Sequence, residues 1–392
     1  MSNYYRDNIP LCGKFRTEID CSLHYRCSNG CDFCFAHGVP VTPTIDLEVI
    51  RKMADSTLKY FYSDTVQKTK CCIFRVMGGE LFEGNLSDEL WEAYRYFFNT
   101  CLDNAEKAGI KINFYIITNL LYKTENLYKA FTLIDELNTR CPGVIDMFGT
   151  SFDLWGRFKT KERLRLWQNN FEVLLLENKK RGIKACGEIV LTKQAYEILR
   201  TKPEDKRDEI ECFEYLYTLV KNKVAEFDIV KFQYTGYASN SLIKDTDKAE
   251  MYKWLIKNYP LFGECQVFLH RIRQTACYGG QVGWFGDDLD LIENVCAYYN
   301  FGRCQDLSPE LSEEEAIQKN LIVSDNRGLN FDQVFEAYIN KFGCTMCKHW
   351  PYCKLECTVD WNLKVTHTDP NSSYCWIKDV YDFVEKEGLF IQ

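Results

Sequence analysis

The chain has 392 residues, a length that favours two domains with a sizeable hydrophobic core. Its formal net charge is −8 and no apolar stretch approaches the ~18 residues of a membrane span, so neither nucleic acid nor a membrane is expected as a partner. Twenty cysteines behind an N-terminus without the apolar segment of a signal peptide point to metal or cluster ligation in a reducing, cytoplasmic compartment rather than to disulfides.

Apolar, β-rich segments alternate with amphipathic segments up to about residue 235. We expect strands at 14–21, 71–77, 111–117, 144–151, 183–191 and 227–234, and helices at 47–60, 88–108, 124–137, 161–181 and 207–224. Gly109, Gly143 and Gly182 precede strands, where a turn favours positive φ. Six such units are fewer than the eight of a closed barrel. The predicted fold class is therefore α/β, a partial (β/α)6 TIM-like barrel followed by a small cysteine-rich iron–sulfur domain.

Three cysteines follow the first predicted strand, in the run Cys27-Ser-Asn-Gly-Cys31-Asp-Phe-Cys34. Three thiolates are one short of the four ligands of a cubane iron–sulfur cluster, so one iron would stay open to a substrate or cofactor. Two plainer interpretations compete: a zinc site completed by His24 or His37, or three unrelated core cysteines. The spacing favours the open iron–sulfur site.

The second predicted strand runs into Gly78-Gly79-Glu80. Two glycines let a ligand approach the backbone closely, and Glu80 offers a carboxylate to a cationic group. Alone, such a tripeptide is usually just a turn. Because the C-terminal ends of parallel strands meet at one edge of a barrel, we expect this segment to lie beside the cysteine triplet.

The triplet, with Phe33 before its last cysteine, and the Gly78-Gly79-Glu80 segment together resemble the radical S-adenosylmethionine (SAM) superfamily over residues 1–235. The resemblance implies that the open iron binds SAM and that reduction cleaves SAM to a 5′-deoxyadenosyl radical, which abstracts hydrogen from the substrate. The residues that it assigns to SAM binding are Phe33, Gly78, Gly79, Glu80, Ser151 and Asp153.

Some of these assignments have structural alternatives. Ser151 and Asp153 would contact the SAM ribose, but Ser151 could instead cap a helix and Asp153 could anchor a turn. The dipeptide Thr118-Asn119 resembles the start of a family Thr-Asn-Gly segment, from which this chain departs at Leu120. Glu188 and Arg165 are further candidates for SAM contact.

Beyond residue 262 the hydrophobic periodicity fades and cysteines cluster, so we expect a barrel domain at 1–235, a linker at 236–262 and a cysteine-rich domain at 263–392. A zinc ribbon is one interpretation of the late cysteines. Their series also resembles the SPASM domain of peptide-modifying radical SAM enzymes, which holds two auxiliary 4Fe–4S clusters. By the family pattern, one cluster is ligated by Cys344, Cys347, Cys353 and Cys375.

The other auxiliary cluster would draw on Cys357 and on the upstream pair Cys277 and Cys296. Leu291 departs from the family pattern, which usually has glycine there. The fourth ligand would be Cys265 or Cys304, or would be absent and leave an iron open. The resemblance thus implies SAM and three 4Fe–4S clusters, one at the triplet and two auxiliary, as cofactors.

The function implied is an oxidoreductase of the peptide-maturase kind, which installs a thioether or carbon–carbon crosslink in a ribosomally made peptide (RiPP) or modifies a protein. Its expected partners are that substrate and a flavodoxin- or ferredoxin-type reductant. Only 26 residues precede Cys27, so leader recognition would need a separate leader-binding protein or another surface of this chain. No catalytic acid or base can be assigned from the sequence.

The alternative function is a SPASM dehydrogenase that oxidises a side chain or a small alcohol, as sulfatase maturases do. The Ala-Tyr-Tyr segment that follows Cys296 lacks the aspartate that those enzymes place after a cluster cysteine, although Asp306 follows Cys304 at a short distance. A non-enzymatic electron carrier or zinc-stapled binding protein is disfavoured, because it has no use for a three-ligand site beside Glu80.

Overall fold

The computed structural model describes residues 17–24, 26–33, 45–62, 66–67, 70–77, 79–231, 244–270, 274–277, 281–284, 340–353 and 374–391. Its centre is a six-stranded sheet with the strands in sequence order, every neighbouring pair parallel. The strands are β1 (Thr17–Ser22), β2 (Cys71–Met77), β3 (Lys111–Thr118), β4 (Ile145–Phe152), β5 (Lys184–Leu191) and β6 (Glu226–Lys231). Sequential parallel strands with β1 and β6 at the two edges give the topology of a partial (β/α)6 barrel, as predicted.

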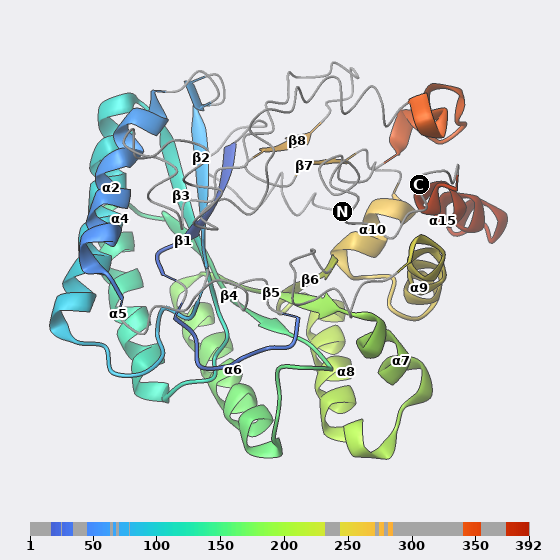
Figure 1. The fold of residues 1–392 in the computed structure, drawn as a ribbon, viewed down its shortest axis with the longest axis horizontal. Helices are drawn as coiled ribbons and strands as arrows, with labels where there is room; N and C mark the ends of the chain where they lie inside the picture. The colour runs from blue at the N-terminus through green and yellow to red at the C-terminus, as the bar shows by residue number, and fades with distance from the viewer. Residues whose placement is uncertain are drawn as a thin grey trace.

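Helices connect the strands and cover one side of the sheet (Figure 1). In chain order they are α2 (Leu47–Phe61), α4 (Asp88–Ala108), α5 (Thr124–Arg140), α6 (Lys161–Arg181), α7 (Lys193–Thr201), a short turn η2 (Glu204–Lys206) and α8 (Arg207–Lys221). Local chemistry defines the longest two. Ser87 and Thr160 accept hydrogen bonds from the first turns of α4 and α6, and Gly109 and Gly182 end these helices with positive φ.

The core between sheet and helices is rich in aromatic rings. Phe74 of β2 makes an edge contact with Phe97 of α4, and Phe98 of the same helix makes one with Phe114 of β3, with ring centroids 6.5 and 4.9 Å apart. Such pairs add about 0.5–1.5 kcal/mol each beyond simple burial. The opposite face of the sheet carries a smaller cluster, formed by Ile73, Tyr115, Met147 and Cys186.

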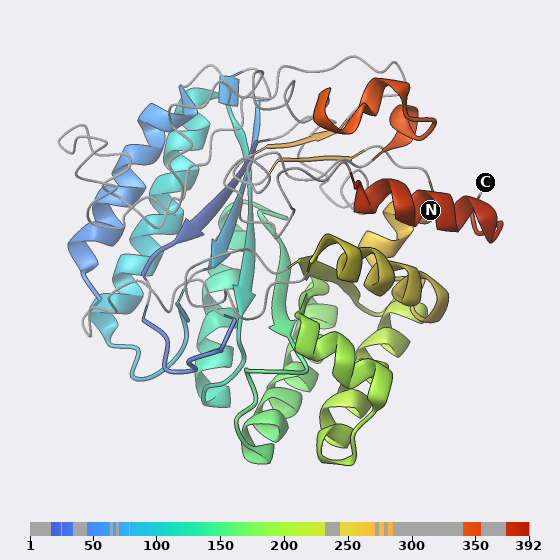
Figure 2. The ribbon, with the colours of Figure 1, turned by 45° about the vertical axis from the view of Figure 1, so that its right-hand side comes forward.

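Residues after β6 join the same core. Helices α9 (Asp245–Asn258), α10 (Gly263–Leu269) and α15 (Trp376–Lys386) pack together beyond the β6 edge, and α9 and α15 lie side by side in Figures 1 and 2. Trp376 and Tyr381 of α15 are buried with Phe268 of α10 in the hydrophobic cluster that also contains the barrel core. The segment expected as a linker therefore contains a packed helix, while the domain boundaries themselves stay predictions.

The remaining described elements are short. Strands β7 (Gln274–Cys277) and β8 (Gln281–Trp284) form an antiparallel pair, and η4 (Cys344–Met346) and η5 (Trp350–Tyr352) are single helical turns. Thirteen described cysteines form no disulfide, whereas Cys71 at the start of β2 is disulfide-bonded, which the sequence did not lead us to expect. Within the described residues, no helix combines the length and apolar character needed to cross a membrane.

Candidate functional site

The predicted site residues gather at one edge of the sheet. Cys27 follows β1, Glu80 follows β2, Asn119 follows β3 and Asp153 follows β4. All four strands are parallel, so these positions lie at the C-terminal edge, where enzymes of this topology place their chemistry. The loop after β1, residues 26–33, is called the cysteine loop below, and the loops after β2, β3 and β4 contact it.

Gly79, in the loop after β2, lies closest to the cysteine loop and the residues just before it. Its φ is +48°, and a Cβ at this position would lie 2.5 Å from the Arg26 carbonyl oxygen and 2.8 Å from that of His24. The next residue, Glu80, donates its backbone N–H to the Arg26 oxygen at 2.8 Å. The close approach expected at Gly79 is therefore made by the protein's own cysteine loop.

Glu83, which the sequence reasoning did not single out, also holds the cysteine loop. Its carboxylate accepts hydrogen bonds from the Ser28 backbone N–H at 2.9 and 3.0 Å and from the Ser28 hydroxyl at 3.0 Å. Arg26 donates in turn to the Glu83 carbonyl oxygen at 3.2 Å. These contacts span more than fifty residues of sequence, which is why spacing alone did not reveal them.

Glu80 is 3% exposed, and its carboxylate joins the loops after β2 and β3. It accepts hydrogen bonds from Phe82 N–H at 3.1 Å, the Thr118 hydroxyl at 2.8 Å and Asn119 N–H at 2.6 Å. Burial raises the pKa of Glu80 to about 7, against these hydrogen bonds. All three donors are uncharged, and a carboxylate can accept about four hydrogen bonds, so the group keeps capacity for a cationic ligand.

Asp153 anchors the loop between β4 and α6. Its side chain accepts a hydrogen bond from Trp155 N–H at 2.7 Å and pairs with Arg157 Nε at 3.2 Å, the turn-anchoring arrangement that was the alternative to ribose contact. Burial raises the pKa of Asp153 to about 7, although Arg157 opposes the rise. The Arg157 guanidinium lies over the Phe33 ring, with its central carbon 5.6 Å from the ring centroid.

Ser151 and Leu120 complete the edge. Ser151 is half-buried in β4 opposite Glu188 of β5, and the cap of the following helix is Thr160, so Ser151 does not cap α6. Leu120 has φ +58°, the left-handed conformation that glycine favours. This strain of about 1–2 kcal/mol is offset by full burial of the leucine side chain and by a hydrogen bond from Asn170 to its carbonyl at 2.9 Å.

The two described cysteines of the loop differ in exposure: Cys31 is buried and Cys27 is half-buried. Burial raises the pKa of the Cys27 thiol to about 12, so metal ligation there would release a proton. Gly78 and Cys34 lie outside the described residues.

His24, a possible zinc ligand in the sequence, is engaged elsewhere. Tyr94 donates its hydroxyl proton to the Leu81 oxygen at 3.0 Å, so His24 Nε2 donates to Tyr94 at 2.7 Å and His24 is neutral. Its Nδ1 is buried with no partner in the described part of the chain. Burial, assisted by Arg26, lowers the pKa of His24 from 6.5 to about 4.

We expect acid to destabilise the fold through His24. Because the folded pKa is depressed, the stabilisation is fully present above pH 6.5 and is lost as the pH falls towards 4, at a cost of about 3 kcal/mol. The free energy of unfolding in urea should be measured at pH 7 and pH 4.5. Between these pH values it should fall by about 2 kcal/mol less in His24→Gln than in the wild type. Tyr94→Phe removes the hydrogen bond at both pH values and should keep the wild-type pH dependence. Equal acid losses in wild type and His24→Gln would contradict this role.

The described cysteines of the C-terminal series lie in the segment 340–353 and at the start of α15. Cys375 is the N-cap residue of this helix, and its sulfur accepts a hydrogen bond from Lys378 N–H at 3.5 Å. The Cys347 N–H donates to the Cys344 oxygen at 2.9 Å across the η4 turn. Lys348, the residue after Cys347, pairs with Asp382 of α15 at 2.9 Å, so this segment is held to the same helix.

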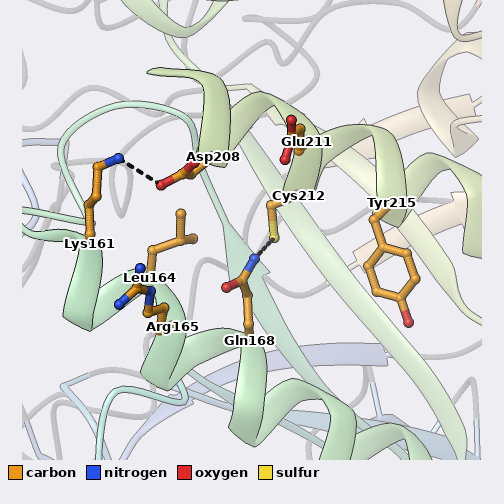
Figure 3. A pocket seen from close by; sticks show the side chains of 8 residues that line it. All are labelled: Lys161, Leu164, Arg165, Gln168, Asp208, Glu211, Cys212 and Tyr215. Carbon is orange, nitrogen blue, oxygen red and sulfur yellow. Dashed lines mark hydrogen bonds and ion pairs between the residues drawn. The ribbon is translucent and has the colours of Figure 1, made fainter. Parts of the chain in front are cut away.

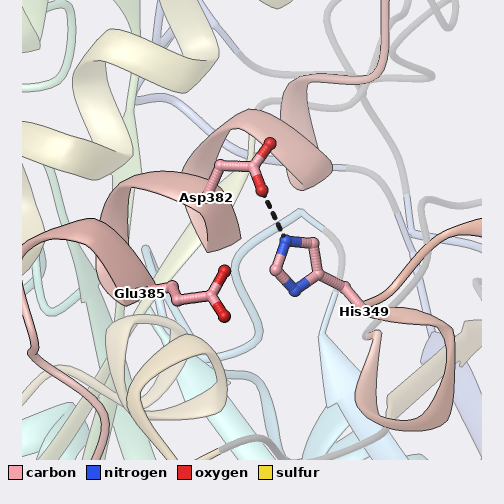
Figure 4. A group of neighbouring side chains, drawn as sticks. All are labelled: His349, Asp382 and Glu385. Carbon is pink, nitrogen blue, oxygen red and sulfur yellow. Dashed lines mark hydrogen bonds and ion pairs between the residues drawn. The ribbon is translucent and has the colours of Figure 1, made fainter.

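His349 fastens this cysteine segment to α15 (Figure 4). Its Nε2 lies 2.8 Å from Asp382 and its Nδ1 lies 2.7 Å from the Tyr352 hydroxyl. Burial opposes ionisation of Asp382, but hydrogen bonds from Lys378, Lys348 and His349 hold its pKa below the usual range. With both ring nitrogens engaged and lysines on the carboxylates, the group His349, Asp382 and Glu385 is a structural network rather than a metal site.

Other predicted ligands are described only in part or not at all. Cys277 ends β7, and only its backbone is described, whereas Cys296, Cys304 and Cys357 lie outside the described residues. Cys353 is half-buried beside the core, and Cys265 is fully buried in α10. Tetrahedral zinc with Zn–S bonds of ~2.3 Å places sulfurs about 3.8 Å apart. No three cysteine sulfurs of the described part lie within 4.8 Å of one another, so they do not have this geometry.

A separate hollow of 310 Å³ lies between α6 and α8, on the helical side of the sheet (Figure 3). Lys161 pairs with Asp208 at 3.0 Å across it, and Gln168 donates to the Cys212 sulfur at 3.7 Å. Arg165, a weaker candidate for SAM contact, lines this hollow. Lys161 and Asp208 already neutralise each other across it, and we assign no function to the hollow.

A scan against protein-family models finds no match, and a search of curated proteins finds none either. Among solved structures, the chain is similar to SuiB of Streptococcus suis bound to S-adenosylmethionine, with 15% identity, a TM-score of 0.42 and coverage of 90% of this chain and 75% of that chain. It is also similar to the rice β-glucosidase Os3BGlu6, with 8% identity, a TM-score of 0.32 and coverage of 63% and 77%. With TM-scores below 0.5, neither likeness supports a statement about this chain.

Proposed function

We propose that this protein is a radical SAM enzyme with its cluster on the cysteine loop. The observation that carries the proposal is the meeting of Cys27, Cys31 and Glu80 at the C-terminal edge of an open parallel sheet. The surroundings fit an anionic, sulfur-rich group: amide N–H groups point at both sulfurs, and the buried Arg157 has a nitrogen, Nη1, with no partner among the described residues.

In this proposal Cys27, Cys31 and Cys34 ligate a 4Fe–4S cluster, and Gly78, Gly79 and Glu80 hold the ammonium group of SAM, with Ser151 and Asp153 at the ribose. The cluster and SAM together supply a carbon radical able to abstract hydrogen from unactivated carbon. The protein's own residues would orient SAM and neutralise its charged groups. Glu80 is suited to a cation because burial already disfavours its charge and its described partners are neutral donors.

We further propose two auxiliary clusters in the C-terminal region, one on Cys344, Cys347, Cys353 and Cys375. Its support is that Cys375 is the N-cap of α15 and that the segment carrying Cys344, Cys347 and Cys353 is held to the same helix by the contacts of Lys348 and His349 with Asp382. The second would be ligated by Cys277, Cys296 and Cys357. The substrate that we propose is a peptide or protein. The electrons that reduce the clusters would come from a flavodoxin- or ferredoxin-type protein.

The test is anaerobic reconstitution of the full chain with iron and sulfide, followed by reduction in the presence of SAM. We expect about twelve irons per chain, for three clusters of four, and release of 5′-deoxyadenosine. Bound zinc without 5′-deoxyadenosine would overturn the proposal. Incubation with short peptides encoded beside the gene then addresses the substrate, because fragmentation of the product locates the change. A peptide oxidised without a crosslink would favour the dehydrogenase alternative over crosslink formation.

A further inference from the structure

The two described cysteines of the loop each face a side-chain amide. Asn29 Nδ2 donates to Cys31 Sγ at 2.9 Å, and Asn119 Nδ2 donates to Cys27 Sγ at 3.6 Å. The orientation of both amides is fixed from the oxygen side. Arg163 donates to Asn29 Oδ1, and the Leu121 N–H donates to Asn119 Oδ1 at 2.7 Å. With the oxygens held by donors, the NH₂ groups must face the sulfurs.

Arg157 supplies a third donor and a positive charge. It is 5% exposed, its Nε is paired with Asp153, and its Nη1 is buried without a partner in the described part of the chain. The guanidinium is held over Phe33 of the cysteine loop. The neighbouring Gly156 oxygen accepts a hydrogen bond from Asp32 N–H at 3.4 Å, so the turn that carries Arg157 lies against the cysteine loop.

An unpaired donor on a buried cation costs several kcal/mol, so it is expected where an acceptor completes it. Asp153 occupies only Nε. The guanidinium lies over Phe33, in a loop whose sulfurs already accept two amide hydrogen bonds. The acceptor that this chemistry fits is an anionic group held by those sulfurs.

We propose that Asn29, Asn119 and Arg157, called the donor shell below, raise the reduction potential of the cluster on the cysteine loop. This inference rests on the proposed function. Reduction adds a negative charge to the cluster, and N–H donors and a nearby cation stabilise the reduced form more than the oxidised form. Arg157 and the two asparagines are positioning residues: they act on the cluster through its sulfurs and contact no substrate.

The test is a redox titration of the reconstituted full chain followed by electron paramagnetic resonance. The signal of the loop cluster is identified as the one that Cys31→Ala removes. In Arg157→Gln we expect the ratio of reduced to oxidised cluster at a fixed potential to fall about tenfold, equivalent to ~59 mV for one electron. Arg157→Lys keeps the positive charge, so the ratio of reduced to oxidised cluster should fall much less in this variant. Asn119→Ala, at a half-buried position, should lower the ratio about threefold.

Arg207→Gln is the matched control, because it removes the same charge from an exposed position on α8 and should change the ratio less than twofold. If Arg157→Gln does not fold, Asn119→Ala and Arg157→Lys decide, with iron content measured in each. Unchanged ratios in variants with wild-type iron content would overturn the donor shell and leave the proposed function standing. Absence of any Cys31-dependent cluster signal in the wild type would overturn the proposed function itself.

Discussion

Gly79→Ala is expected to abolish cluster binding by the cysteine loop while leaving most of the barrel folded. The added Cβ would lie 2.5 Å from the Arg26 oxygen, 2.8 Å from the His24 oxygen and 2.9 Å from the Arg26 nitrogen. All three are backbone atoms, so no side chain can rotate away. Left-handed φ adds about 1–2 kcal/mol and overpacking about 1–3 kcal/mol, and both are relieved when the loop moves off β2.

Iron content after reconstitution, release of 5′-deoxyadenosine and thermal unfolding measure this effect together. Gly109→Ala is the matched control: Gly109 also has positive φ, +67°, but a Cβ there meets no atom within 4 Å. It should cost about 1 kcal/mol of stability and keep full iron binding. If Gly79→Ala bound as much iron as Gly109→Ala, the contact between Gly79 and the cysteine loop would not position the ligands.

Cys31→Ala and Cys353→Ala are expected to separate the two stages of the reaction. Loss of the Cys31 thiolate leaves two ligands on the loop, so SAM cleavage should fall at least a hundredfold and about four irons should be lost. Cys353 lies in the segment held to α15 and is not a ligand of the loop cluster, so its variant should keep a measurable part of SAM cleavage and lose product.

The readouts are 5′-deoxyadenosine and modified peptide in the same reaction. Cys141→Ala is the control for removal of a thiol, because Cys141 is a half-buried residue at the end of α5. It should change neither readout. Equal loss of both readouts in Cys31→Ala and Cys353→Ala would show that the two cysteine groups do not serve separate steps.

The barrel could be predicted closely from local signals. The segments Cys71–Met77, Asp88–Ala108 and Lys161–Arg181 have the predicted bounds, because apolar periodicity and strong caps coincide there. The helix at 193–201 was not predicted, since it begins only two residues after β5 ends and is short. Helices α9 and α15 were not predicted either, because their apolar faces pack against each other and against α10, contacts that only the fold supplies.

Some residues of the candidate site could likewise be predicted from the sequence, and others could not. The cysteines and Glu80 could be singled out because motif spacing is visible in one dimension. Glu83, Asn29 and Arg157 could not, since each also contacts a residue distant in sequence that the fold supplies: Ser28, Arg163 and Phe33, respectively. Leu120 shows the reverse case: the residue departs from the glycine pattern, yet its backbone adopts the conformation that glycine would.

The packing of α15 against α10 has a consequence for the order of assembly. Ile391 N–H donates to the Leu269 oxygen at 2.8 Å, and the Tyr381 ring packs against Phe268 with centroids 4.9 Å apart. Partners more than a hundred residues apart in sequence therefore complete one core. Such distant closure is slow compared with the formation of neighbouring β/α units. The barrel can therefore take shape first, and the segment that carries Cys344, Cys347 and Cys375 becomes fixed only when α15 docks. A metal centre in this segment would therefore form last, and binding of the metal would stabilise the docked position of α15.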